Sequence, residues 1–135
     1  MNQERRWKIV LVEVERLAGR GTILIVDDNL GFVVWAGRML TDAGYAVMPA
    51  ESVRHAKGLV DDHRLEISVL MVNPLLRGIP EFIDSLRAAQ KTMRVVALEQ
   101  PMAGVFGVQT VVSRPTDVGI AESAAWLKRI ERLCF

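Results

Sequence analysis

The chain has 135 residues, half of them hydrophobic, and its 17 basic and 16 acidic residues leave a formal net charge of +1. This length predicts one domain with a full core, and the composition excludes a disordered chain or an electrostatic nucleic-acid surface. No apolar run approaches the roughly 20 residues that span a bilayer. The single cysteine, Cys134, can form no internal disulfide. We therefore expect a soluble, cytoplasmic protein that binds neither membrane nor nucleic acid.

Residues 1–20 stand apart from the rest of the chain. Trp7, Val10, Val14 and Leu17 fall at helical spacing, although residues 9–12 are β-prone. We expect an amphipathic helix, followed by a glycine hinge at residues 19–21. This extension is interpreted as a partner-binding or dimerising segment, or as the tail of an upstream domain. Residues 21–135 then form the main domain.

The segment Thr22 to Val26 predicts a short strand that is buried on both faces and ends in Asp27 and Asp28. In an open parallel sheet, ligands bind at the carboxyl ends of the strands, so this acid pair marks a candidate cation or phosphoryl site. Side chains alternate along a strand, and we expect only one of the two acids to face a bound ion. The alternative is that Asp-Asp-Asn simply starts a helix.

Strands and helices alternate along the remaining chain. The sequence predicts helices over residues 30–43, from Ser52, from Pro80, and from Thr116 or Asp117. The buried stripe of the last helix is predicted to contain Ile120, Ala124, Leu127, Ile130 and Leu133, with Trp126 beside it. Further strands are predicted at residues 45–48, stopped by Pro49, and at residues 69–72, 95–98 and 110–113. This alternation predicts a parallel sheet covered on both faces.

Polar residues follow the later strands as well. Asn73 ends the third strand, Glu99 the fourth, and Arg114-Pro115 closes the fifth. Between the fourth and fifth strands, residues 100–107 leave little room for a helix because a proline and two glycines interrupt them. His55 and His63 lack metal-site spacing and are predicted to be surface residues.

Four sequence segments carry a resemblance: ILIVDDN at the first strand, AGYAV before the second, VLMVN in the third, and SRP after the fifth. Over residues 21–135 the chain resembles the receiver domains of response regulators in two-component signalling. The resemblance implies a flavodoxin-like (CheY-like), doubly wound five-stranded parallel sheet in the order 2-1-3-4-5. In that family the acid pair holds magnesium, and an aspartate after the third strand accepts a phosphoryl group from a histidine kinase. A hydroxyl residue follows the fourth strand, an aromatic residue lies in the fifth, and a lysine precedes a proline.

Only part of that pattern is present here. Asp27 and Asp28 match the acid pair, but Asn73 stands in the place of the phosphoacceptor, and an amide cannot form the acyl phosphate. At the switch positions, Glu99 replaces the hydroxyl residue, Val111 the aromatic residue and Arg114 the lysine, while Pro115 is kept; the fourth helix is shortened or missing.

These departures lead us to expect a pseudo-receiver, not an enzyme, that acts through protein–protein interaction. Its partner would be a histidine kinase, a regulator or an output domain, and a homodimer is compatible with the sequence. We expect Arg114 to pair with Glu99, with Asp28 or with both, in place of phosphate and metal. The alternative is that Glu99 and Arg114 are solvated loop residues that do not meet. A weak Mg²⁺ site at Asp27 and Asp28, with Asn73 as a neutral oxygen ligand, stays open, and no other cofactor is expected.

Two other functions compete with this one. In the first, Asp27 or Asp28 is the phosphoryl acceptor and the chain is a working response regulator. In the second, the chain is a small α/β enzyme or ligand-binding domain that only shares the fold. The second is disfavoured because the sequence has no Gly-rich phosphate loop, Cys/His pair or serine elbow.

Overall fold

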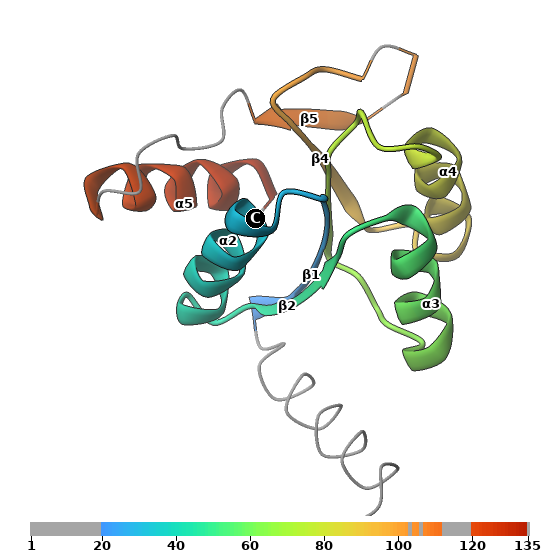
Figure 1. Ribbon diagram of the computed structural model, residues 1–135, viewed down its shortest axis with the longest axis horizontal. Helices are drawn as coiled ribbons and strands as arrows, with labels where there is room; N and C mark the ends of the chain where they lie inside the picture. The colour runs from blue at the N-terminus through green and yellow to red at the C-terminus, as the bar shows by residue number, and fades with distance from the viewer. Residues whose placement is uncertain (1–19, 103, 106, 112–119, 135) are drawn as a thin grey trace, which may run out of the picture.

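The computed structural model describes residues 20–102, 104–105, 107–111 and 120–134 (Figure 1). Its five strands form one parallel sheet in the order β2-β1-β3-β4-β5, as predicted. The strands are β1 (Thr22–Val26), β2 (Ala46–Ala50), β3 (Val69–Val72), β4 (Arg94–Leu98) and β5 (Val108–Val111). The helices of the described residues are α2 (Leu30–Asp42), α3 (Val53–His63), α4 (Ile79–Ala89) and α5 (Ile120–Cys134).

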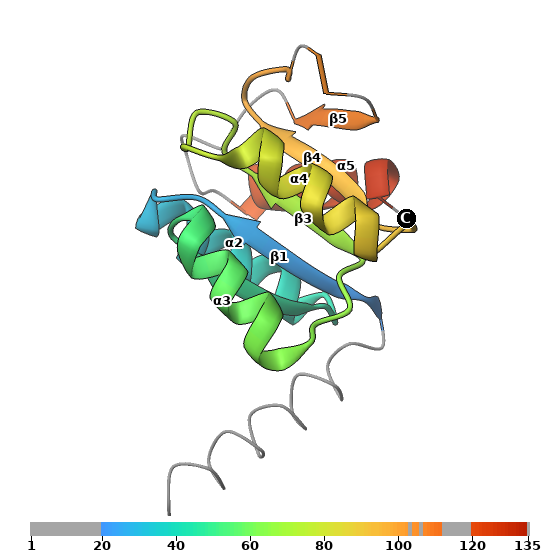
Figure 2. The ribbon, with the colours of Figure 1, turned by 90° about the vertical axis from the view of Figure 1, so that its right-hand side faces the viewer.

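Each face of the sheet is covered by two helices, with α2 and α5 on one side and α3 and α4 on the other (Figures 1 and 2). Side chains of β1 alternate between the two cores: Ile23 and Ile25 belong to the α2/α5 core, Leu24 and Val26 to the α3/α4 core. All four are fully buried. A central strand buried on both faces explains why the sequence there is a continuous apolar run.

The parallel register brings three strand ends to one edge of the sheet. Val26 of β1 lies opposite Val72 of β3, and Val72 lies opposite Ala97 of β4. The next residues after β1 and β3, Asp27 and Asn73, are therefore neighbours at the carboxyl edge. The predicted juxtaposition of polar residues at this edge is confirmed for these two.

The second and fifth strands differ most from their predicted bounds. The second strand does not stop at Pro49 but includes it, opposite Ile25 of β1. Proline is tolerated there because β2 is an edge strand, and its missing N–H can face away from the ladder. The fifth strand runs over Val108–Val111 and so starts two residues before the predicted position, directly after Gly107 (φ 72°).

The buried stripe of α5 also differs from the prediction. Among the described side chains of α5, the buried ones are Ser123, Trp126, Ile130 and Cys134, of which Ile130 was predicted. Leu127 and Leu133 are half-buried and pack against the α2/α5 core, Ala124 is exposed, and the side chain of Ile120 lies outside the described residues. Trp126 is 2% exposed and packs edge-on against Phe32 and Trp35 of α2, with ring centroids 6.0 and 4.8 Å away. This aromatic contact sets the rotation of the helix. Trp126 is a core residue.

The connection between β4 and β5 has turns but no helix in its described residues, as predicted. Its apolar side chains Met102 and Val105 pack against the α3/α4 core instead. Arg87 of α4 holds the end of the connection, with Nη2 donating to the carbonyl oxygen of Gly107 at 3.0 Å. A short loop thus covers sheet surface that a helix would otherwise cover.

The predicted helix in the N-terminal extension lies outside the described residues, apart from Arg20. In the part of the chain that the structure describes, no helix combines the length and apolar character needed to cross a membrane.

Two glycines give opposite predictions for stability. Gly58 lies within α3, and a Cβ there would meet no atom within 4 Å. We expect Gly58→Ala to raise the free energy of unfolding by up to about 1 kcal/mol, because glycine is a poor helix former. Gly44 has φ +100°, and a Cβ there would lie 2.9 Å from Cδ of Arg20. Gly44→Ala should lower the free energy of unfolding by more than about 1 kcal/mol. Urea unfolding of both variants tests the pair; equal shifts would contradict it.

Candidate functional site

Asp27 is a fully buried carboxylate at the carboxyl end of β1. Its Oδ1 accepts hydrogen bonds from the Asn29 backbone N–H and from Nδ2 of Asn73, both at 3.2 Å. Its own N–H donates to the carbonyl oxygen of Ala50 at 2.9 Å, which ties it to β2. A buried charge is costly unless it is hydrogen-bonded, so these donors are what allow an acid to lie here.

Asn73 bridges β3, β1 and the loop that follows β3. Its backbone N–H donates to Val26 O at 2.9 Å, and its Oδ1 accepts from the Leu75 N–H at 2.9 Å. Leu76 N–H donates to the Asn73 carbonyl at 3.2 Å, which closes a turn. Because Leu75 requires an acceptor and Asp27 requires a donor, only one orientation of the amide satisfies both.

Asp28 and Asn29 have different roles from Asp27. Asp28 is exposed, as the alternation of side chains predicted for one member of the pair. Asn29 caps α2, with Oδ1 accepting from the Phe32 N–H at 3.1 Å. The interpretation of this segment as a helix start is confirmed for Asn29, whereas the role of Asp27 in a cation or phosphoryl site stays a prediction.

The arrangement of Asp27 and Asn73 can be compared with the ligands that the expected weak magnesium site would require. The described residues contain no group of three or more His, Cys, Asp or Glu that could hold a metal ion. Asn73 presents its amide nitrogen to Asp27, and its oxygen is engaged by Leu75. Mg²⁺ takes oxygen ligands, so the residues as arranged do not fit this ion unless the amide turns over. Binding at Asp27 and Asp28 stays a prediction.

Glu99 is exposed and follows β4 with a left-handed backbone, φ 69°. Non-glycine residues adopt this conformation at a cost, and here it belongs to a tight turn in which Gln100 N–H donates to Leu98 O at 2.8 Å. Arg114 and Pro115 lie outside the described residues, as does the side chain of Val111. The expected pairing of Arg114 with Glu99 or Asp28 therefore stays a prediction.

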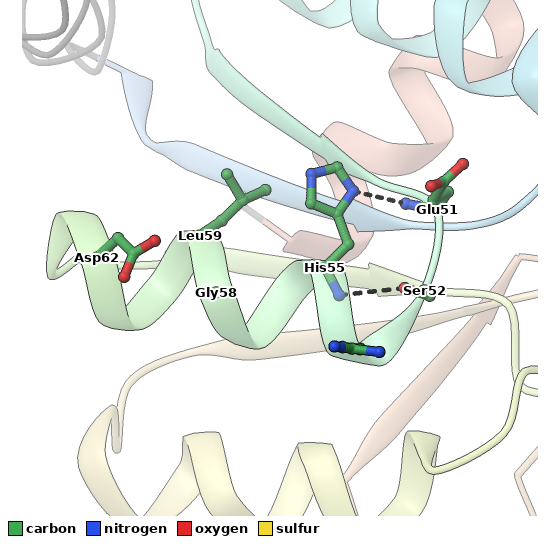
Figure 3. A pocket seen from close by; sticks show the side chains of 7 residues that line it. Glu51, Ser52, His55, Gly58, Leu59 and Asp62 are labelled. Atoms are coloured by element: carbon green, nitrogen blue, oxygen red, sulfur yellow. Dashed lines mark hydrogen bonds between the residues drawn. The ribbon is translucent and has the colours of Figure 1, made fainter.

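Both histidines lie on α3. His55 is exposed in the first turn of the helix (Figure 3). Its ring Nδ1 accepts a hydrogen bond from the Glu51 backbone N–H at 3.4 Å, and its backbone N–H donates to Ser52 Oγ at 3.1 Å. His63, half-buried, ends the same helix. Figure 3 also shows a hollow beside Gly58, lined by Leu59 and Asp62 among others. Neither histidine joins Asp27 or Asn73 in the described hydrogen bonds.

Sequence reasoning missed the part played by Leu75. Its N–H fixes the amide of Asn73, so the loop after β3 helps to define the site. The available signal was the Asn-Pro pair, which favours a turn in which the asparagine side chain accepts from the backbone two residues on.

Comparisons with known proteins inform only on the fold of this chain. No protein-family model matches the chain, and no curated protein sequence matches it. Among solved structures, the receiver domain of the hybrid histidine kinase CckA superposes with a TM-score of 0.66 at 22% identity, covering 85% of this chain and all of that one. The chain has the receiver-domain fold.

Two further structures agree. The chemotaxis response regulator CheY4 of Vibrio cholerae gives a TM-score of 0.64 at 20% identity over 84% of this chain and 98% of its own. NtrX from Brucella abortus gives 0.65 at 16% identity over 84% of this chain but only 26% of its own length. The receiver-like fold of this chain therefore resembles domains that occur both alone and within longer proteins. Identities this low establish the fold alone.

The Asp27–Asn73 contact predicts the behaviour of Asn73→Asp. This variant removes the donor and places a second carboxylate beside a buried one, so the free energy of unfolding should fall by roughly 2 kcal/mol at pH 7. The loss should shrink towards pH 4, where one acid of the pair can hold a proton, and when Mg²⁺ is added to neutralise both. Urea unfolding at the two pH values measures this. Asp28→Asn, at an exposed position, is the control and should change stability little; equal losses in both variants would contradict the assignment.

Cys134 gives a separate test of the core. It is buried at the end of α5, and burial raises the pKa of its thiol to about 11. At pH 8 only about one thiol in a thousand is then ionised, and the thiolate is the reactive form. We expect the native protein to resist an aromatic disulfide reagent at pH 8 and to react fully in denaturant. Reaction should accelerate as the pH rises towards 11; rapid native labelling at pH 8 would contradict this packing.

Proposed function

We propose that the chain is a receiver-like signalling domain that is not phosphorylated at the usual position and that acts by binding another protein. The observation that carries this is the hydrogen bond from Nδ2 of Asn73 to the buried carboxylate of Asp27. At the carboxyl edge of the sheet, where a receiver domain keeps its acceptor aspartate, this chain has a neutral amide that lacks the nucleophilic oxygen of a carboxylate.

The hydrogen bond between Asn73 and Asp27 also supports a domain with a single resting state, that is, one arrangement of the carboxyl edge that phosphorylation does not change. In a receiver domain the charge at this edge changes on phosphorylation. Here the amide neutralises no charge, but it supplies the donor that the buried Asp27 requires, without a metal ion or a phosphoryl group. Because Asn73 also holds Leu75, the loop after β3 is kept in one arrangement. We infer that signalling by this chain depends on partner binding.

The partner we propose is a signalling protein: a histidine kinase, a regulator or an output domain. The supporting likeness is to structures named as part of a hybrid histidine kinase and as response regulators. For contact with a partner, α5 offers the exposed side chains Lys128, Arg129 and Arg132, whereas Trp126 is buried. The connection after β4 offers the exposed Pro101 beside half-buried Met102. No reaction is assigned to the chain.

The first experiment is intact mass spectrometry after incubation with acetyl phosphate and Mg²⁺. The wild type should keep its mass, whereas Asn73→Asp, which regains a carboxylate nucleophile, should gain one phosphoryl group. Omitting Mg²⁺ from the variant reaction is the matched control and should abolish the gain.

A phosphorylated wild type would contradict the proposal and favour the alternative in which Asp27 or Asp28 is the acceptor. Asp27→Asn and Asp28→Asn would then identify the residue. Asp28 is the accessible one of the two, because Asp27 is fully buried.

A further inference from the structure

A hollow of about 370 Å³ opens at the amino edge of the sheet, where β4 and β5 begin. It lies between the turn after α4 and the starts of these two strands. Asp27 and Asn73 are at the other end of the parallel strands, so the hollow is separate from the carboxyl-edge site. The polar side chains that line it are Lys91, Thr92, Arg94 and Gln109. This space is called the amino-edge hollow below.

Gly107 keeps the amino-edge hollow open. Val95 of β4 lies opposite Val108 of β5, so the residues just before them, Arg94 and Gly107, flank the opening together. Gly107 has no side chain to fill the space beside Arg94, and its φ of 72° disfavours other residues at this position. The buried side chains of Met93 and Val95 add apolar surface to the lining. The hollow therefore combines exposed polar groups with an apolar wall.

The charged side chains that line the amino-edge hollow are both cations. Lys91 and Arg94 are exposed, and among the described residues no acidic side chain lines the same space. Arg87 adds a third positive charge beside it, because its Nη2 donates to the carbonyl oxygen of Gly107 at 3.0 Å. Like charges that share a site repel one another, and an anion between them removes that repulsion.

The hollow beside Gly58 on α3 carries mixed charge instead. Glu51 and Asp62 line it together with Arg54 and His55, so acids there accompany the base. The whole chain has a formal net charge of only +1, which makes the amino-edge hollow a local excess of positive charge. Charge complementarity therefore favours an anionic ligand at the amino edge and not in the hollow on α3.

We propose that the amino-edge hollow binds a phosphate group, either as free phosphate or as part of a small phosphate ester. The Arg94 guanidinium offers a fork of N–H donors that matches two phosphate oxygens, and Lys91 adds the second charge that a dianion requires. Thr92 and Gln109 can donate to further oxygens. A volume of about 370 Å³ lies in the range of small-molecule pockets, so the rest of an ester also fits. This site is independent of whether Asn73 prevents phosphorylation.

Titration of the full-length chain, followed by the NMR signals of its backbone amides, tests this proposal. The probes are sodium phosphate and adenosine monophosphate, and sodium acetate at matched ionic strength controls for charge screening. We expect both phosphate probes to shift the amide signals of Thr92, Gly107 and Gln109 along saturating curves, and acetate to shift them little. Tighter binding of adenosine monophosphate than of free phosphate would identify an ester as the ligand. Equal or weaker binding would identify free phosphate.

Charge-removing variants locate the site. Arg94→Gln should weaken phosphate binding roughly tenfold, because charge-assisted hydrogen bonds are lost. Lys91→Gln, in an exposed turn, should also weaken it and decides the question if Arg94→Gln does not fold. The matched control is Arg54→Gln, an exposed arginine in the hollow on α3, which should leave binding unchanged. Shifts that acetate reproduces, an absence of saturation, or equal effects of Arg54→Gln and the amino-edge variants would each overturn the proposal.

Discussion

The hydrogen bond between the Asn73 amide and the Asp27 carboxylate is the constraint on which the carboxyl edge of this sheet depends. A fully buried carboxylate at the end of a central strand must be neutralised or supplied with donors, since isolated buried charge is strongly unfavourable. Two donors to its Oδ1 come from different loops: the Asn29 backbone at the start of α2 and the Asn73 side chain at the end of β3. One acid therefore couples the cap of a helix to the turn after a neighbouring strand.

The sequence predicted most of the fold because its central strands carry an unambiguous pattern. Residues 23–26 and 69–72 are continuous apolar runs, and both lie in strands buried on two faces. Errors came at the periphery, where the pattern alone does not decide. Pro49 lies in an edge strand, which tolerates a missing N–H, and β5 is likewise an edge strand. The rotation of α5 follows from the edge-on packing of Trp126 against Phe32 and Trp35, a long-range contact that helical spacing cannot reveal.

The candidate site was predictable in position but not in bonding. Strand ends in a parallel sheet meet at one edge, so the proximity of Asp27 and Asn73 follows from topology. Which atom of the amide faces Asp27 does not follow from topology. That choice is made by the Leu75 N–H, which takes Oδ1 and leaves Nδ2 for the carboxylate. The difference matters chemically. An amide oxygen that faced Asp27 could be a ligand of a metal ion beside the acid, whereas the amide nitrogen donates a hydrogen bond to the acid in the place of such an ion.

The residue after Asn73 makes this arrangement chemically durable. Asparagine converts slowly to aspartate when the backbone nitrogen of the following residue attacks the side-chain carbonyl and expels ammonia, and water then opens the cyclic imide that has formed. That route requires a backbone N–H, and Pro74 has none. The neutral amide at this edge is thus protected from deamidation. Deamidation would produce a carboxylate that repels Asp27 and could accept a phosphoryl group. Pro74, which helps to form the turn, also keeps Asn73 from becoming the aspartate that receiver domains use. The proposed single resting state therefore follows from Asn73 and Pro74 together.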